Sequence, residues 1–209
     1  MIDVISLAES QSGTQKPACL DTILSETKGL GFTMASELAL GPVLALLAAS
    51  KPAGNLLELG TGTGLGTAWL LSGMTQTARL TSVESDPEAA NVARRHLGTD
   101  SRLDLGIMDG ESFLSGADGS PPYDLIFADT WPGKFTLLEQ TLGLLAPGGL
   151  YVVDDLLAQE TWPEGHDAAV EALCGTLAAW PGGRFARLDW ASGIGLLVAT
   201  ERFDAEPPR

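Results

Sequence analysis

The chain has 209 residues, of which 44% are hydrophobic, and a formal net charge of −15 at pH 7. This length suits one α/β domain with a sizeable core, and the apolar content argues against disorder. Because the many carboxylates repel phosphate backbones and anionic lipids, we expect neither nucleic acid nor a membrane as a partner. No apolar run is long enough for a transmembrane helix and no secretory leader opens the chain, so we expect a cytoplasmic protein.

The chain has only two cysteines and two histidines, too few and too scattered to indicate a zinc site or a catalytic triad. Cys19 and Cys174 lie far apart without metal-ligand spacing, so we expect reduced thiols. His96 and His166 also lie far apart, and His96 falls in a predicted helix beside two arginines. The sequence therefore predicts neither a zinc site nor a serine triad.

The apolar periodicity predicts helices and strands in alternation along most of the chain. In chain order the elements are a helix at 17–28, a helix at 35–50, a strand at 55–59, a helix at 65–74, a strand at 79–84, a helix at 87–97, strands at 103–107 and 123–128, a helix at 135–145, a strand at 150–153, a helix at 164–180, and strands at 184–190 and 194–200. Residues 147–149 are predicted to turn the chain, and residues 191–193 to close a hairpin.

This order of elements predicts an α/β fold. Strands that alternate with helices form a parallel sheet covered on both faces, and continuous apolar runs suit doubly buried strands. We therefore predict a Rossmann-like, doubly wound, mostly parallel seven-stranded sheet with an antiparallel C-terminal hairpin. The chain is expected to be a single domain over 1–209, with an N-terminal helical extension at 1–50, a core at 51–202 and a loose tail at 203–209.

Each of the first five predicted strands ends in a glycine loop or an acid. Ligands of doubly wound sheets bind at the carboxyl ends of the strands, so these positions are the candidate site. In strand order they are Gly60-Thr61-Gly62-Thr63-Gly64, Glu84, Asp109-Gly110, Asp129 and Asp154-Asp155.

The glycine loop and the acid after it predict a cofactor that contains adenosine. Glycines allow the backbone to approach a ligand closely, and Glu84 stands where a carboxylate can bind both hydroxyls of a ribose. The dinucleotide fingerprint fails, because Leu65 and Thr67 stand where its last glycine would be. Glu58 would repel a pyrophosphate but can reach a methionine amine. We therefore predict S-adenosylmethionine (SAM), with an NAD-binding oxidoreductase as the less favoured alternative.

Two later segments and one earlier segment carry a resemblance to a known family. Residues 123–129 read Tyr-Asp-Leu-Ile-Phe-Ala-Asp, and residues 144–157 contain Ala-Pro-Gly-Gly-Leu-Tyr-Val-Val-Asp-Asp. Together with Met34-Ala35-Ser36, they resemble class I SAM-dependent methyltransferases, and among them the cation-dependent O-methyltransferases similar to catechol and caffeoyl-CoA O-methyltransferases. The resemblance covers residues 30–200.

The resemblance implies methyl transfer to a hydroxyl of a small molecule and a role for each matched residue. Met34 and Ser36 would contact the methionine part of SAM, Glu84 the ribose, and Asp109 and Gly110 the adenine. Asp129, Asp154 and Asp155 would bind Mg²⁺ or another divalent cation, with Asp129 also near the methionine. Bacterial members of the subgroup suggest a homodimer.

The sequence departs from the family pattern beside the expected metal site. Pro132 replaces the family's lysine, which leaves Lys134 as the candidate general base, and Asp155 replaces an asparagine. A third carboxylate still suits a divalent cation. Two alternatives remain: a site without metal, in which one acid is the base, and an acidic pair that caps a helix.

Two tryptophans near these acids are candidate substrate residues. Trp131 and Trp162 are expected either to line an aromatic acceptor or to anchor loops. Loss of the family lysine also keeps open a degenerate, non-catalytic SAM-binding protein.

Overall fold

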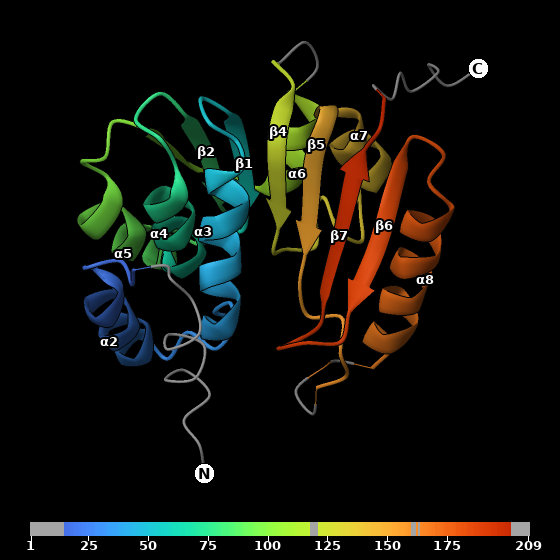
Figure 1. Ribbon diagram of the computed structural model, residues 1–209. Coiled ribbons are helices and arrows are strands. Elements are labelled where there is room, and N and C mark those ends of the chain that lie inside the picture. The colour runs from blue at the N-terminus through green and yellow to red at the C-terminus, as the bar shows by residue number, and fades with distance from the viewer. Residues whose placement is uncertain (1–14, 118–120, 160–161, 163, 202–209) are drawn as a thin grey trace.

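The computed structural model describes residues 15–117, 121–159, 162 and 164–201. A seven-stranded sheet forms its centre, with the strand order β3-β2-β1-β4-β5-β7-β6 (Figure 1). The strands are β1 (Asn55–Leu59), β2 (Arg79–Glu84), β3 (Leu103–Ile107), β4 (Tyr123–Ala128), β5 (Leu145–Val153), β6 (Gly183–Leu188) and β7 (Ile194–Ala199). The first five strands pair in parallel, whereas β7 is antiparallel to both β5 and β6. The predicted Rossmann-like sheet with its closing hairpin is confirmed.

Helices lie on both faces of this sheet (Figure 1). They are α2 (Leu20–Leu30), the 3-10 helix η1 (Leu38–Leu40), α3 (Gly41–Ala49), α4 (Leu65–Gly73), α5 (Pro87–Leu97), α6 (Gly110–Ser115), α7 (Leu138–Gly143) and α8 (His166–Ala179). Within the described ranges, none of these helices has the length and apolar character that a membrane crossing requires.

Two hydrophobic cores lie on opposite faces of the sheet. Helices α2 to α5 contribute to one core and α6 to α8 to the other. Successive strand residues alternate between the two, since Leu56 packs in the first core and Leu57 in the second. Both residues are fully buried, as expected of a strand covered on both faces. This packing holds the carboxyl ends of β1, β2, β4 and β5 together at one edge of the sheet, the lower edge in Figure 1.

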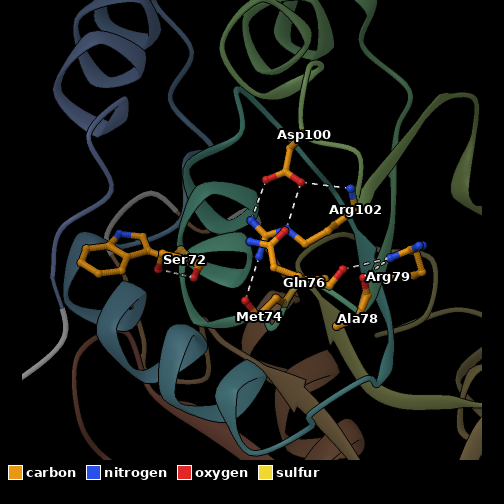
Figure 2. A network of polar contacts seen from close by, with 8 residues as sticks. Ser72, Met74, Gln76, Ala78, Arg79, Asp100 and Arg102 are labelled. Atoms are coloured by element: carbon orange, nitrogen blue, oxygen red, sulfur yellow. Dashed lines mark hydrogen bonds and ion pairs between the residues drawn. The ribbon is translucent and has the colours of Figure 1, made fainter.

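A polar cluster at the β2–β3 side of the sheet joins the end of α4 to the turn before β3. The Arg102 guanidinium donates to both carboxylate oxygens of Asp100, at 2.9 Å from Nε and 2.6 Å from Nη2, and to the backbone oxygen of Met74 at 2.7 Å (Figure 2). These contacts tie the turn before β3 to the end of α4. Because Asp100 and Arg102 lie at the amino end of β3, away from the carboxyl ends that carry the predicted site residues, we assign these contacts to the fold.

The structure corrects the prediction after Asp129. The predicted helix at 135–145 is only Leu138–Gly143, because residues 131–136 form a tight turn in which the N–H groups of Lys134, Phe135 and Thr136 all point to the oxygen of Trp131. Leu137 then adopts a positive φ of 55°. The prediction that residues 147–149 turn the chain is also wrong, since they lie within β5 at a register shift. Helix α6 was not predicted.

Candidate active site

The loop from β1 to α4 presents backbone rather than side chains. Gly60, Gly62 and Gly64 all have positive φ angles, of 95°, 53° and 98°. A Cβ on Gly60 would lie 2.6 Å from the backbone oxygen of Asp129, so the loop packs directly against the end of β4. Such a loop allows a ligand to approach main-chain N–H groups closely.

Glu84 extends from the end of β2 to this loop. Its Oε2 accepts a hydrogen bond from the Gly62 N–H at 2.7 Å, and its Oε1 accepts one from the Asp86 N–H at 2.9 Å. Both bonds come from backbone groups, and the side chain is partly exposed. The carboxylate is therefore oriented beside the glycine loop and retains free lone pairs.

Glu58 is fully buried inside β1, below the loop. Its Oε2 accepts hydrogen bonds from Thr67 Oγ1 at 2.6 Å and Ser82 Oγ at 2.5 Å. Its Oε1 has no hydrogen-bond partner among the described residues and faces Gly66, where an added Cβ would come within 2.7 Å of it. Burial raises the pKa of Glu58 to about 7. One oxygen of this carboxylate is therefore buried without a partner at the first turn of α4.

The segment between α2 and η1 contacts the end of β4. Ser36 Oγ donates a hydrogen bond of 2.5 Å to Asp129 Oδ2, which brings together two residues far apart in the sequence. Met34, nearby in this segment, has a side chain that is 78% exposed. Ser36 thus lies at the predicted site, whereas the predicted contact of Met34 depends on a ligand.

Three aspartates gather at the ends of β4 and β5. Asp129, Asp154 and Asp155 each offer a carboxylate oxygen, and these oxygens lie within 4.8 Å of one another. Asp154 is fully buried, and within the described ranges neither of its carboxylate oxygens has a hydrogen-bond partner. Burial and the charge of Asp129 raise the pKa of Asp154 well above its usual range. Burial likewise raises the pKa of Asp129 to about 6, although Ser36 donates to it.

Asp155 occupies a strained conformation at the edge of this acidic cluster. Its φ is 54°, a region that residues with a side chain seldom adopt. Its Oδ1 accepts a hydrogen bond from Gln159 Nε2 at 2.7 Å. Strain of this kind persists where the surrounding structure over-determines it, as in functional sites.

Lys134 is the positive charge beside the acidic cluster. Its Nζ donates to the backbone oxygen of Asp154 at 2.7 Å and lies 3.8 Å from Asp154 Oδ1. The side chain is only 5% exposed. These two contacts place a positive charge beside the buried Asp154 carboxylate, and the predicted role of Lys134 as the general base stays a prediction.

The end of β3 contributes a capped helix. Asp109 Oδ2 accepts a hydrogen bond from the Ser112 N–H at 3.0 Å, so it is the N-cap of α6. Gly110, the first residue of α6, lies against Pro132, which an added Cβ would approach to 3.1 Å. The predicted contact of both residues with adenine stays a prediction.

The two predicted substrate residues meet around His166. The ring centroids of Trp131 and His166 lie 5.8 Å apart, and those of Trp162 and His166 lie 4.5 Å apart. Phe135 completes the group, at 4.8 Å from Trp131 and 5.1 Å from His166. We call these four residues the aromatic cage.

Comparison with known proteins identifies the family. A family model described as a methyltransferase domain matches residues 57–156, from within β1 to just after β5. The matched segment contains the glycine loop, Glu84 and the whole acidic cluster. The segment from β1 to β5 is therefore a methyltransferase domain.

Curated and solved relatives of this methyltransferase domain agree with that assignment. A catechol O-methyltransferase of Niastella koreensis is 30% identical over 147 residues, which is 66% of each chain. The chain spans between 53% and 66% of the length of the first curated relatives that it matches. The O-methyltransferase TomG from Streptomyces achromogenes, solved in complex with SAM, superimposes with a TM-score of 0.81 at 21% identity, covering 96% of this chain and 100% of TomG. An O-methyltransferase from Bacillus cereus, solved with S-adenosylhomocysteine (SAH), gives a TM-score of 0.80 at 20% identity, covering 94% of this chain and 96% of that one.

Sequence analysis missed three polar residues of this methyltransferase site. Thr67 and Ser82 hold the buried Glu58 carboxylate, and His166 lies at the centre of the aromatic cage. Thr67 was noted only as a missing glycine of the dinucleotide pattern. His166 carried no sequence signal, because its position depends on the tight turn after Asp129 and on where α8 begins.

Proposed function

We propose that this protein transfers the methyl group of SAM to a hydroxyl oxygen of a small molecule. The observation that carries the proposal is the position of the Glu84 carboxylate beside the glycine loop, at the same sheet edge as Asp129. The N. koreensis relative, named as a catechol O-methyltransferase, supports oxygen as the methyl acceptor. SAM supplies an activated methyl group, and its transfer requires in-line approach of the acceptor oxygen, so positioning carries much of the catalysis.

The residues of the loop fit such a cofactor. Glu84 would accept hydrogen bonds from the ribose hydroxyls with the lone pairs that the backbone leaves free. The unpartnered Oε1 of Glu58 fits the cationic methionine end, since a buried carboxylate oxygen without a donor is costly. Gly60, Gly62 and Gly64 have the positive φ angles that this tight loop requires, and the loop would present its main-chain N–H groups to the cofactor.

The acidic cluster fits a divalent cation such as Mg²⁺. Asp129, Asp154 and Asp155 offer only oxygen ligands, which hard cations prefer. Once deprotonated, as metal ligation requires, the three carboxylates would carry two negative charges beyond the ammonium of Lys134, and a divalent cation would neutralise them. The two unpartnered oxygens of Asp154 would gain a partner. A cation held by these residues would lower the pKa of an acceptor hydroxyl.

Binding and activity measurements test this function. In calorimetric titrations, SAM and SAH should bind with micromolar affinity and NAD should not bind; failure of SAM and SAH to bind would overturn the proposal. In a methyl-transfer assay over a panel of phenols and catechols, EDTA should abolish turnover and Mg²⁺ should restore it. Turnover that is indifferent to EDTA would remove the cation from the proposal. SAM binding without any transfer would favour a degenerate SAM-binding protein, which the replacement of the family lysine by Pro132 motivates.

We infer also that the enzyme works in the cytoplasm as a homodimer, on a small molecule and without nucleic acid or membrane. The net charge of −15 supports the exclusion of polyanionic partners. Light scattering of the purified chain checks the dimer, and a monomeric mass would contradict it.

A further inference from the structure

His166 is a partly exposed residue whose imidazole packs among aromatic rings. It is the first residue of α8, and the rings of Trp131, Phe135 and Trp162 surround it at centroid distances between 4.5 and 5.8 Å. Both ring nitrogens are inaccessible to solvent and have no hydrogen-bond partner among the residues that the structure describes. The imidazole is therefore packed as an apolar ring although it carries a donor and an acceptor.

Such an arrangement is costly without a second role for the side chain. A buried polar group without a hydrogen-bond partner is destabilising, and native proteins contain few of them. A phenylalanine would fill the same space without this cost. Burial, together with the positive charge of Lys134, lowers the pKa of His166, while Asp155 and Asp167 oppose the shift. The neutral imidazole thus has one nitrogen that can accept a hydrogen bond.

The aromatic cage borders the acidic cluster. Trp131 and Phe135 belong to the turn that follows Asp129, whereas Trp162 and His166 follow Asp155 along the chain. Lys134 connects the two groups: its Nζ bonds to the oxygen of Asp154 and lies 5.4 Å from the ring centroid of Phe135. A ring that enters the cage would therefore lie next to the carboxylates at the ends of β4 and β5.

We propose that His166 contacts the methyl acceptor, accepting a hydrogen bond from a second hydroxyl on an aromatic ring that enters the cage. The proposal rests on the methyltransferase function proposed above and adds the residue that recognises the non-reacting oxygen. Trp131 is 51% exposed, and its ring would have to move aside to admit the acceptor. A site built to bind a hydroxyl discriminates against analogues that lack it, because its own polar group is then left unpaired.

Nuclear magnetic resonance of the two histidines tests the contact without requiring turnover. The chain has only His96 and His166, and His96 is an internal reference because its Nε2 bonds to Glu26 Oε1 at 2.7 Å, between α5 and α2. Catechol added to the protein with SAH and Mg²⁺ should shift the ring ¹⁵N resonances of His166 and leave those of His96 unchanged. Catechol that fails to bind, or that binds without moving the His166 resonances, overturns the proposal.

Kinetics of matched variants test the specificity. His166→Phe keeps the aromatic packing and removes the nitrogens, His166→Gln keeps a hydrogen-bonding group, and His96→Gln is the control. We expect His166→Phe to lower kcat/KM for catechol by about tenfold or more while sparing phenol, with partial recovery in His166→Gln and wild-type values in His96→Gln. Equal losses for catechol and phenol, or no loss for either, would reject the contact.

The two experiments separate this inference from the proposed function. A His166 resonance that moves with catechol in a protein that transfers no methyl group leaves the contact in place and rejects the transfer. Methyl transfer to catechol with an unmoved His166 resonance rejects the contact and leaves the transfer in place.

Discussion

Individual polar atoms of the site are buried without partners, and each has a measurable consequence. Glu58 is the clearest case, because its folded pKa of about 7 lies above the value of about 4.3 expected in the unfolded chain. Between these two values the folded protein keeps a proton that the unfolded chain has lost. The free energy of unfolding therefore falls as the pH rises through this window.

Replacement of Glu58 by glutamine should remove this pH dependence. At pH 4.5 we expect Glu58→Gln and the wild type to unfold at nearly equal denaturant concentrations. At pH 8 the variant should be more stable by up to roughly 3 kcal/mol, at about 1.4 kcal/mol per pKa unit. Urea titrations at the two pH values measure this difference, and a constant difference across the range would contradict the assigned burial.

Glu84 is a second single residue with a measurable role. We expect its replacement to change the affinity for SAM rather than the stability of the fold. It is partly exposed and bonds to the N–H groups of Gly62 and Asp86. Glu84→Ala should weaken SAM binding by roughly tenfold or more, through loss of hydrogen bonds to a charged group. Calorimetry measures the loss, and an unchanged affinity would show that the ribose lies elsewhere.

At the scale of elements, the glycine loop is held between β1 and β4. Gly60 has a φ of 95°, and a Cβ there would meet the backbone oxygen of Asp129 at 2.6 Å. Gly148, within β5, has a similar φ of 77° but no atom within 4 Å of its added Cβ. A side chain would strain the backbone at both positions, but only at Gly60 would it also collide with another part of the chain.

This pair of glycines allows a matched test. Gly148→Ala should cost only the strain of the positive φ, about 1 kcal/mol. Gly60→Ala should cost about 1–3 kcal/mol more, since backbone has to move, and should also impair SAM binding. Thermal unfolding and calorimetry of both variants provide the comparison; equal destabilisation would mean that β4 does not constrain the loop.

In the molecule as a whole, the net charge of −15 makes the acidic side chains repel one another, which destabilises the folded state. The acidic cluster brings three of these side chains together. Monovalent salt should raise the melting temperature modestly by screening this repulsion. Mg²⁺ should raise it further than sodium chloride at the same ionic strength, because an ion that binds only the folded state stabilises it. The additional rise should vanish in Asp154→Asn. A rise of the same size in that variant would indicate screening alone.

Much of the fold follows from local sequence. The strands at 55–59, 79–84, 103–107 and 123–128 have the predicted bounds. The clearest cases are β1 and β4, whose apolar runs are buried on both faces of the sheet, as strands covered on both sides require. The order of elements also placed the glycine loop, Glu84 and the three aspartates at one edge, because parallel strands end together.

Tertiary contacts decided what local sequence left open. A turn at 131–136 stands where the start of a helix was predicted. In it, the N–H groups of Lys134, Phe135 and Thr136 all donate to the Trp131 oxygen. That turn carries Lys134 to Asp154 and Phe135 to His166, contacts between segments far apart in the chain. No periodicity encodes them, since they depend on how two loops pack after the sheet has formed. The sequence by itself therefore determined the sheet and its acidic edge, and the packing of those loops determined the surroundings of that edge.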